Sequence, residues 1–269
     1  MKSPKLQRAA VLGLAGLLLA LASGCGRILA ESQGKKDNAK SLPEWKPPAR
    51  IPAGHAGERV RLGRNIFNHT PKYAPAYAGN QLSCSDCHLQ GGAAAFSSPM
   101  IGLPGLFPMY NKRAGRVISL AERIQECFVR SENGKPPAAD SAEMTAMLAY
   151  MDWLSQGQPK GRAFPGRGLV KLPALRGDPG RGAAIYARQC AVCHGDDGAG
   201  VPPILPPLWG ATAFNDGAGM SKVEKMAAFV QHNMPQNAPG SLSAQQAYDV
   251  AAYVNSKPRP KMNPAYKKY

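Results

Sequence analysis

Two copies of the pentapeptide Cys-x-x-Cys-His are the most chemically informative feature of this chain. Their members are Cys84, Cys87 and His88 in the first copy and Cys190, Cys193 and His194 in the second. At this spacing two thiols add to the vinyl groups of one haem, and the adjacent histidine coordinates its iron. A redox Cys-x-x-Cys pair or half of a zinc site is the alternative, but no further cysteine pair sits at zinc-finger spacing. The sequence therefore predicts two covalently bound c-type haems, and two haems in one chain point to electron transfer.

The second haem needs a distal iron ligand, and Met234, followed by Pro235, is the strongest candidate. It lies after His194 in the second repeat, and a thioether ligand raises the reduction potential of a haem. His232 and Met226 are nearby alternatives, and Met234 would then pack in the core. We expect His194 and Met234 to coordinate the second iron.

In the first repeat, the residue that lies about as far after His88 as Met234 lies after His194 is a cysteine, Cys127. Of the six cysteines, four are assigned to haem and Cys25 to an N-terminal signal, so Cys127 has no disulfide partner. It is either a buried small hydrophobe or a functional thiolate, and a thiolate ligand stabilises ferric iron. We expect His88 and Cys127 to coordinate the first iron. Three residues rival Cys127 for this position: Met100, Met109 and His69.

A single helix over residues 119–131 is expected to carry this thiol. Ser119 at the N-cap and Glu122 three residues later form a capping-box pattern. Residues three and four apart share one helix face. The side chains predicted to flank the thiol are Arg123, Arg130 and Ser131 on the helix and Arg113 in the preceding loop. Guanidinium groups bind oxyanions and favour a thiolate, although pairing with haem propionates is the alternative role.

Residues 1–24 read as an export signal that ends at a cysteine. A basic start is followed by an apolar run, residues 9–22, that is too short for a comfortable membrane span. The sequence Ala-Ser-Gly-Cys at residues 22–25 resembles a bacterial lipobox, so we expect Cys25 to be lipidated and to begin the mature protein. An ordinary secretory signal, which leaves Cys25 as a spare thiol, is the alternative. The expected location is the periplasmic side, with a lipid anchor as the membrane attachment.

An internal repeat sets the expected fold. Each repeat opens on a helix with Gly-x-x-x-aromatic spacing, at Gly63 and at Gly182, and closes on an amphipathic helix with Ala-Tyr, at Tyr150 and at Tyr253. A glycine on one helix and a ring on the other allow the two helices to cross closely. Strand signals are scarce. We therefore predict an all-α fold with two tandem class I cytochrome c-like domains, each with one covalent haem.

Composition gives the expected boundaries within the 269 residues. They are a signal peptide at 1–24, a flexible tether at 25–55, an N-terminal cytochrome c domain at 56–157, a linker at 158–178, a C-terminal cytochrome c domain at 179–257 and a basic tail at 258–269. Removing residues 1–24 with their three cations lowers the formal charge from +16 to +13. Such basicity implies an anionic substrate, an acidic redox partner or a polyanion. Nucleic acid is not an expected partner, because the chain carries no nucleic-acid motif and is read as exported.

These features together resemble the thiosulfate dehydrogenase family of dihaem cytochromes c, over about residues 61–260. The most specific stretch is Arg123-Ile124-x-x-Cys127-Phe128-x-Arg130-Ser131-x-Asn133-Gly134-Lys135. The second is Asp249-Val250-Ala251-Ala252-Tyr253-Val254-Asn255-Ser256-x-Pro258-Arg259-Pro260. The resemblance implies a His/Cys active-site haem in the first domain and an electron-exit haem in the second. It also implies a substrate pocket lined by Arg113, Arg123, Arg130 and Ser131.

Two departures from the family pattern accompany this resemblance. Some members place a lysine beside the distal methionine, where it competes for iron, whereas this chain has Asn233. The expected lipid anchor also differs from a freely soluble periplasmic form.

The resemblance implies an oxidoreductase that couples two thiosulfates to tetrathionate, in either direction. Its electrons are expected to leave through the second haem to an acidic acceptor cytochrome or a similar redox protein. One alternative is a dihaem electron carrier resembling cytochrome c4, in which Met100 or Met109 serves the first iron and Cys127 has no role. The other alternative is the haem-bearing subunit of a sulfur-oxidising complex.

Overall fold

The computed structural model of the chain describes residues 45, 48 and 50–269. All of them belong to the unit Pro43–Tyr269. The expected signal peptide, the lipidation site at Cys25 and most of the expected tether lie outside these residues. Within the described part of the chain, no helix is both long enough and apolar enough to cross a membrane.

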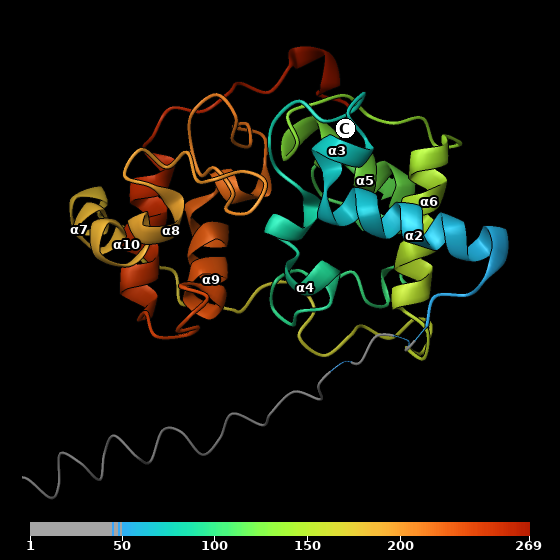
Figure 1. Ribbon diagram of the computed structural model, residues 1–269. Helices are drawn as coiled ribbons and strands as arrows, with labels where there is room; N and C mark the ends of the chain where they lie inside the picture. The colour runs from blue at the N-terminus through green and yellow to red at the C-terminus, as the bar shows by residue number, and fades with distance from the viewer. Residues whose placement is uncertain (1–44, 46–47, 49) are drawn as a thin grey trace, which may run out of the picture. The chain divides into compact units, whose positions relative to one another are not determined.

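The first half of the described chain is mostly helical (Figure 1). Its elements are the α-helices α2 (Gly54–Asn68), α3 (Thr70–Tyr73), α4 (Leu89–Gly92), α5 (Leu120–Arg130) and α6 (Ala142–Leu154), and the 3-10 turns η1 (Cys84–Asp86) and η2 (Leu103–Gly105). A small hairpin of β1 (Met109–Asn111) and β2 (Arg116–Ile118) departs from the purely helical expectation. Its strands have only three residues each, so no alternating pattern is long enough to be read from the sequence.

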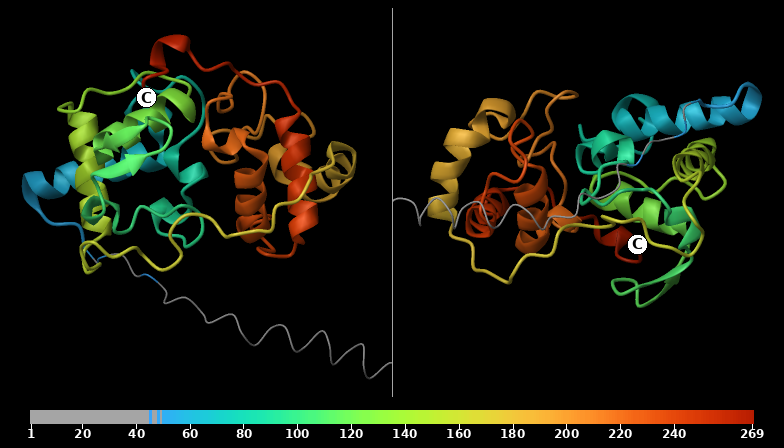
Figure 2. Two further views of the ribbon diagram at one scale, coloured as in Figure 1. Left: turned by 180° about the vertical axis from the view of Figure 1, so that it is seen from behind. Right: turned by 90° about the horizontal axis from the view of Figure 1, so that it is seen from below.

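The second half repeats the helical plan. Its elements are α7 (Pro179–Gln189), α8 (Ala191–His194), α9 (Val223–Asn233) and α10 (Ala244–Asn255), with the 3-10 turns η3 (Gly219–Ser221) and η4 (Pro264–Tyr266). After α10 the chain returns to the first half (Figure 2). There the sulfur of Met262 accepts a hydrogen bond from Arg130.

The same helix crossing forms the centre of each half. Helix α2 crosses α6 at Gly63, where an added Cβ would overlap the backbone oxygen of Ala146. Helix α7 crosses α10 at Gly182, where a Cβ would overlap the backbone oxygen of Asp249. The glycines are required because the two backbones touch at these points. The expected pairing of a glycine helix with a tyrosine helix is confirmed in both repeats.

Each half buries its own hydrophobic core around this crossing. The first core includes Ile66, Phe67, Phe128 and Met144, and the second includes Tyr186, Trp209, Phe214 and Val254. Leu82 precedes the first haem motif in sequence, yet its side chain packs in the second core. The two cores and the repeated helical plan agree with the prediction of two similar, mainly helical domains.

Candidate active site

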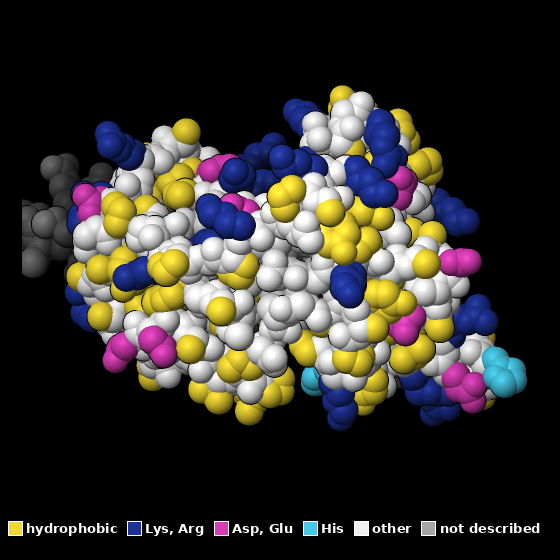
Figure 3. All heavy atoms as spheres, turned by 90° about the horizontal axis from the view of Figure 1, so that it is seen from above, with side chains coloured by type: hydrophobic (Ala, Val, Ile, Leu, Met, Phe, Trp, Pro, Cys, Tyr) yellow, Lys and Arg dark blue, Asp and Glu magenta, His cyan; other side chains and the backbone are white. Residues whose placement is uncertain are grey.

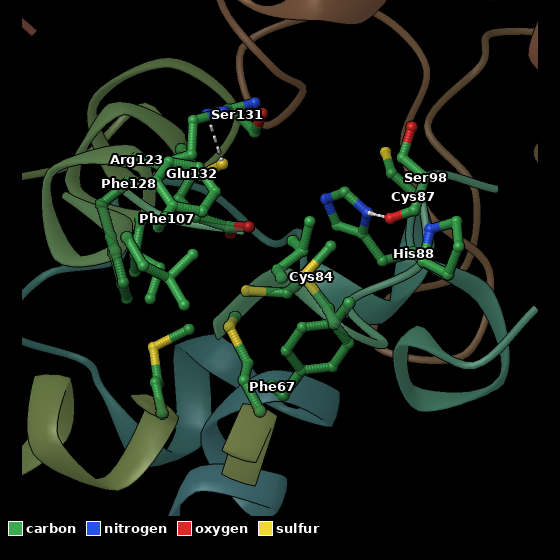
Figure 4. A pocket seen from close by; sticks show the side chains of 18 of the residues that line it. Phe67, Cys84, Cys87, His88, Ser98, Phe107, Arg123, Phe128, Ser131 and Glu132 are labelled. Atoms are coloured by element: carbon green, nitrogen blue, oxygen red, sulfur yellow. Dashed lines mark hydrogen bonds between the residues drawn. The ribbon is translucent and has the colours of Figure 1, made fainter. Parts of the chain in front are cut away.

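A cavity of about 350 Å³ lies at the first Cys-x-x-Cys-His motif (Figure 4). Cys84, Cys87 and His88 line it, and Arg123 and Ser131 lie across the pocket from His88. The other walls are largely apolar and include Phe67, Met100, Phe107, Phe128, Met147 and Met151. Two thiols, an imidazole and apolar walls are the residues that a covalently attached haem requires. The chain's own residues therefore fit a c-type haem at this position.

The imidazole of His88 is held in one orientation by a backbone carbonyl. Its Nδ1 lies 2.7 Å from the backbone oxygen of Ser98, so Nδ1 carries a proton and donates a hydrogen bond to that oxygen. Burial lowers the pKa of His88 to about 4. A neutral ring with Nδ1 fixed in this way presents Nε2 as the metal-ligating atom.

Helix α5 brings the candidate thiol to the cavity, and its start follows the sequence prediction. Ser119 Oγ accepts a hydrogen bond from the Glu122 amide at 3.2 Å, and the Glu122 carboxylate accepts one from the Ser119 amide at 2.7 Å. This reciprocal capping box satisfies two backbone donors at the helix start. Ser131 follows the last helical residue at the other end. The predicted helix over 119–131 is confirmed.

The side chains of Arg123, Cys127 and Ser131 all line the cavity. Arg123 Nη1 donates a hydrogen bond to the sulfur of Cys127 at 3.1 Å and lies 3.4 Å from the carboxylate of Glu126. The negative charge available at Cys127 is the main reason that the pKa of Arg123 is raised. The i, i+4 spacing thus joins a thiol to a permanent cation one helical turn away.

Arg113 and Arg130 are not among the residues that line this cavity. Arg130 turns away from it, and its Nη1 donates to the backbone oxygen of Gly217 at 3.2 Å and to the Met262 sulfur at 3.1 Å. Its Nη2 also contacts the backbone oxygen of Tyr269. Arg113 is exposed in the turn of the β1–β2 hairpin. Burial lowers the pKa of Arg130, and the positive charge of Arg113 lowers it further.

The rival ligands for the first iron differ in position. Met100 and Met109 line the cavity, and the Met109 sulfur lies 3.5 Å from an Arg167 nitrogen. His69 is not among the lining residues, and its ring lies beside that of Tyr73. A methionine therefore remains the competitor to Cys127 on geometric grounds.

Three residues of this cavity carry no recognisable signal in the sequence. Glu132 is buried, its Oε2 has no hydrogen-bond partner among the described residues, and burial raises its pKa well above the usual range. Phe214 and Met220 come from the second half and also line the cavity. A contact with a residue of the other half leaves no local pattern in the sequence.

The second Cys-x-x-Cys-His motif repeats the arrangement of the first. His194 Nδ1 lies 3.0 Å from the backbone oxygen of Pro206, so this ring is also fixed with Nε2 available for a metal. Burial lowers the pKa of His194 and raises the pKa of Cys190 to about 11. Met234 follows the last residue of α9 and is half-buried. These residues also fit a c-type haem.

The rivals of Met234 are engaged elsewhere. Met226 is buried in the second core, and its sulfur accepts a hydrogen bond from Asn255 Nδ2 at 3.3 Å. The ring of His232 packs edge-on against Phe96, with 4.9 Å between ring centroids.

Two family models match the chain, one on each half. The SoxA/TsdA cytochrome c domain matches residues 71–159, and the cbb3-type cytochrome c oxidase subunit III family matches residues 177–254. Together with the relatives below, they establish two covalently bound c-type haems in this chain.

The relatives extend over most of the chain. A thiosulfate dehydrogenase of Stutzerimonas stutzeri is 44% identical over 262 residues, which cover 91% of this chain and 85% of that protein. One of Allochromatium vinosum is 42% identical, covering 79% of this chain and 82% of that protein. The solved thiosulfate dehydrogenase (TsdBA) of Marichromatium purpuratum superposes with a TM-score of 0.78 at 40% identity, over 84% of this chain and 51% of that chain. This chain thus spans about half of the TsdBA chain. On identity and coverage, it belongs to the thiosulfate dehydrogenase family.

Proposed function

We propose that this chain joins two thiosulfate ions into tetrathionate and passes the two released electrons to an acceptor. The observation that carries the proposal is the Cys127 thiol, which lines the cavity of the first haem motif with Arg123 3.1 Å from its sulfur. A guanidinium neighbour favours a thiolate and attracts oxyanions. The relatives' name, thiosulfate dehydrogenase, agrees with this chemistry.

The two haems are assigned to the two motifs. Cys84 and Cys87 would attach the first haem, and Cys190 and Cys193 the second. The proposed iron ligands are His88 and Cys127 for the first haem and His194 and Met234 for the second. When bound, each haem accepts one electron, so the pair stores the two electrons that one tetrathionate releases.

The proposed reaction at Cys127 has two steps. The thiolate and the outer sulfur of one thiosulfate form a sulfur–sulfur bond, and two electrons leave this pair of sulfurs. The outer sulfur of a second thiosulfate then attacks the outer sulfur of the bound one, tetrathionate leaves, and the Cys127 thiolate is restored. The first step is an oxidation and the second a displacement, so the net change is two thiosulfates to one tetrathionate and two electrons. Run backwards, the same steps reduce tetrathionate.

Positive charge around the cavity supports the approach of two dianions. Arg123 lines the pocket. Burial first, and then the positive charges of Arg113 and Arg123, lower the pKa of Lys225, and the charges of Arg113 and Arg123 likewise lower the pKa of Arg130 after burial. Lys and Arg side chains also predominate over acidic ones on the face shown in Figure 3. Preorganised cations offset the repulsion between the substrates. We assign Arg123 and Ser131 to direct contact with the substrate. We assign Arg113 and Arg130 to the surrounding positive charge that attracts it.

The same basic surface suits an acidic electron acceptor, a cytochrome or a similar redox protein. We further propose that the chain acts on the periplasmic side, with lipidated Cys25 as its anchor.

The function is tested by the products of the purified dihaem protein and its Cys127→Gly variant. Wild type is expected to consume two thiosulfates and two one-electron acceptors for each tetrathionate formed, and Cys127→Gly to lose turnover by roughly a hundredfold or more. Ala121→Gly in the same helix is the matched control, because it also places a glycine in α5 but lies outside the cavity. Full turnover by Cys127→Gly would refute the role of the thiol.

The dihaem electron carrier remains the second candidate, because Met100 and Met109 also line the cavity. That function predicts rapid electron exchange with no tetrathionate formed.

A further inference from the structure

The helix that carries Cys127 is completed at its C-terminal end by the other half of the protein. The last carbonyl groups of an α-helix have no partner inside the helix and need one elsewhere. In α5 the backbone oxygen of Val129 accepts a hydrogen bond from Asn215 Nδ2 at 2.8 Å, and that of Arg130 accepts one from the Asn215 amide at 3.2 Å. One residue of the second half thus satisfies two of the last carbonyls of the active-site helix.

Burial and hydrogen bonds fix the side chain of Asn215 in this position. The residue is fully buried, at 0% exposure. Besides the bond to Val129, Nδ2 donates to Asn133 Oδ1 at 3.0 Å, and Oδ1 accepts from the Gly217 amide at 3.0 Å. Every polar atom of the side chain is therefore used, and an isosteric aspartate would point an oxygen at two acceptors.

A second asparagine makes the reciprocal contact from the first half. Asn80 Nδ2 donates to the backbone oxygen of Ser131 at 2.7 Å and to that of Ala213 at 3.2 Å. Phe214, between Ala213 and Asn215, lines the haem cavity. The segment 213–215 therefore forms a cavity wall and holds the end of α5 at the same time.

The C-terminal segment covers this joint from outside. Asp216 donates its amide to the backbone oxygen of Pro260 at 3.0 Å, and its carboxylate accepts the Met262 amide at 2.9 Å and pairs with Lys261 at 3.1 Å. Arg130 closes the joint by donating to the backbone oxygen of Gly217 at 3.2 Å. A Cβ at Gly217 would press on both Met262 and Arg130, so the loop is trapped between α5 and the C-terminal segment.

We propose that Asn215 is a positioning residue for the active site, supplied to the first haem domain by the second. It fixes the last turn of α5, so that Cys127, one turn before Ser131, presents its sulfur to the cavity together with Arg123. The substrate role of Cys127 rests on the proposed function, whereas the positioning by Asn215 does not. It follows that the first domain alone lacks part of its own active site.

The test uses the dihaem protein with Asn215→Asp and Asn215→Ala, and with Asn255→Ala as the matched control. Asn255 is also an asparagine of the second half. Its Nδ2 donates a hydrogen bond within that half, to the backbone oxygen of Ala251 at 3.0 Å. Two readouts are needed: electron paramagnetic resonance of the two ferric haems, and hydrogen exchange of the amides in residues 127–134. The second haem serves as the internal measure of folding.

Both Asn215 variants are expected to alter the signal of the first haem, speed exchange in residues 127–134 and lower kcat/KM by roughly ten- to a hundredfold, with the second haem's signal unchanged. Asn255→Ala should do none of these. A wild-type first-haem signal in Asn215→Asp, or an equal loss of both haem signals, would overturn the proposal. A wild type that forms no tetrathionate would refute the proposed function alone, because the resonance and exchange readouts need no substrate.

Discussion

Among the individual residues, Cys127 and Arg123 lie one helical turn apart, and this spacing places a guanidinium nitrogen 3.1 Å from the sulfur. Glu126, which is buried, holds the same guanidinium at 3.4 Å and also accepts a hydrogen bond from Asn111 at 2.9 Å. The cation is thus fixed from two sides. Fixed charge of this kind needs no reorganisation when an anion arrives, which is the condition for strong electrostatic stabilisation.

Replacing this cation by a different one tests its geometry. Arg123→Lys keeps the positive charge but loses the planar guanidinium, whose several N–H groups can bond the sulfur and an oxyanion at the same time. We expect kcat/KM for thiosulfate to fall about tenfold, equivalent to about 1.4 kcal/mol. Arg116→Lys is the control, because Arg116 is exposed on β2 and pairs with Glu122 at 2.8 Å. Equal kcat/KM for Arg123→Lys and wild type would show that charge alone suffices.

Among the helices, the two glycine crossings should tolerate no side chain. Gly182→Ala would push a Cβ into the Asp249 backbone, and we expect the free energy of unfolding of the dihaem protein to fall by about 1–3 kcal/mol. Gly219→Ala is the control, because its added Cβ would meet nothing closer than 3.9 Å. Urea unfolding, followed by haem absorption, gives the free energy of unfolding of each variant. Equal unfolding midpoints for Gly182→Ala and Gly219→Ala would contradict the close crossing.

The same α7–α10 crossing is held by a buried carboxylate with a pH signature. Asp249 accepts two hydrogen bonds from Arg181, at 2.7 and 2.8 Å, and these bonds are the main reason that the pKa of Asp249 lies below its usual range. A lowered carboxyl pKa contributes stability that is fully present above the unfolded value, about 3.9, and is lost as the pH falls through the folded value.

Asp249→Asn should therefore lower the free energy of unfolding at pH 7, by a modest amount because the arginine partner is exposed to solvent. The difference from wild type should shrink as the pH falls below about 4. Unfolding curves at about pH 7 and pH 3 measure both effects, with Asp140→Asn, at an exposed position, as the control. A difference that persists unchanged in acid would rule out the ionised pair as its source.

Across the molecule, the proposed function places the substrate at the first haem and the exit of electrons at the second. Met234→Ala is expected to lower the reduction potential of the second haem, because it would remove the proposed thioether ligand. Thiosulfate should still reduce the first haem, while electron delivery to the acceptor slows. Met226→Leu is the control, since Met226 is buried in the core and leucine fills a similar volume. An unshifted potential in Met234→Ala would reject this ligand.

The sequence predicts the local features of this molecule and misses the joint between its halves. The haem motifs, the Ser119–Glu122 capping box and the glycine crossings are visible because each depends on a short spacing or a repeated period. The expectation that Arg130 lines the pocket came from its helix position, but its guanidinium bonds to Gly217 and Met262 instead. Asn215 was missed for the same reason: its partners lie in the first half of the chain, and no periodicity encodes such contacts.

Low-temperature electron paramagnetic resonance of the oxidised dihaem protein, with wild type beside Cys127→Met, decides whether the thiol is an iron ligand. If Cys127 coordinates the first iron, wild type shows a thiolate-type low-spin signal that Cys127→Met lacks, and the second haem's signal is the same in both. Two methionine-type signals that the substitution leaves unchanged would contradict thiolate ligation. The cavity would then belong to a plain electron carrier with Met100 or Met109 on its first iron.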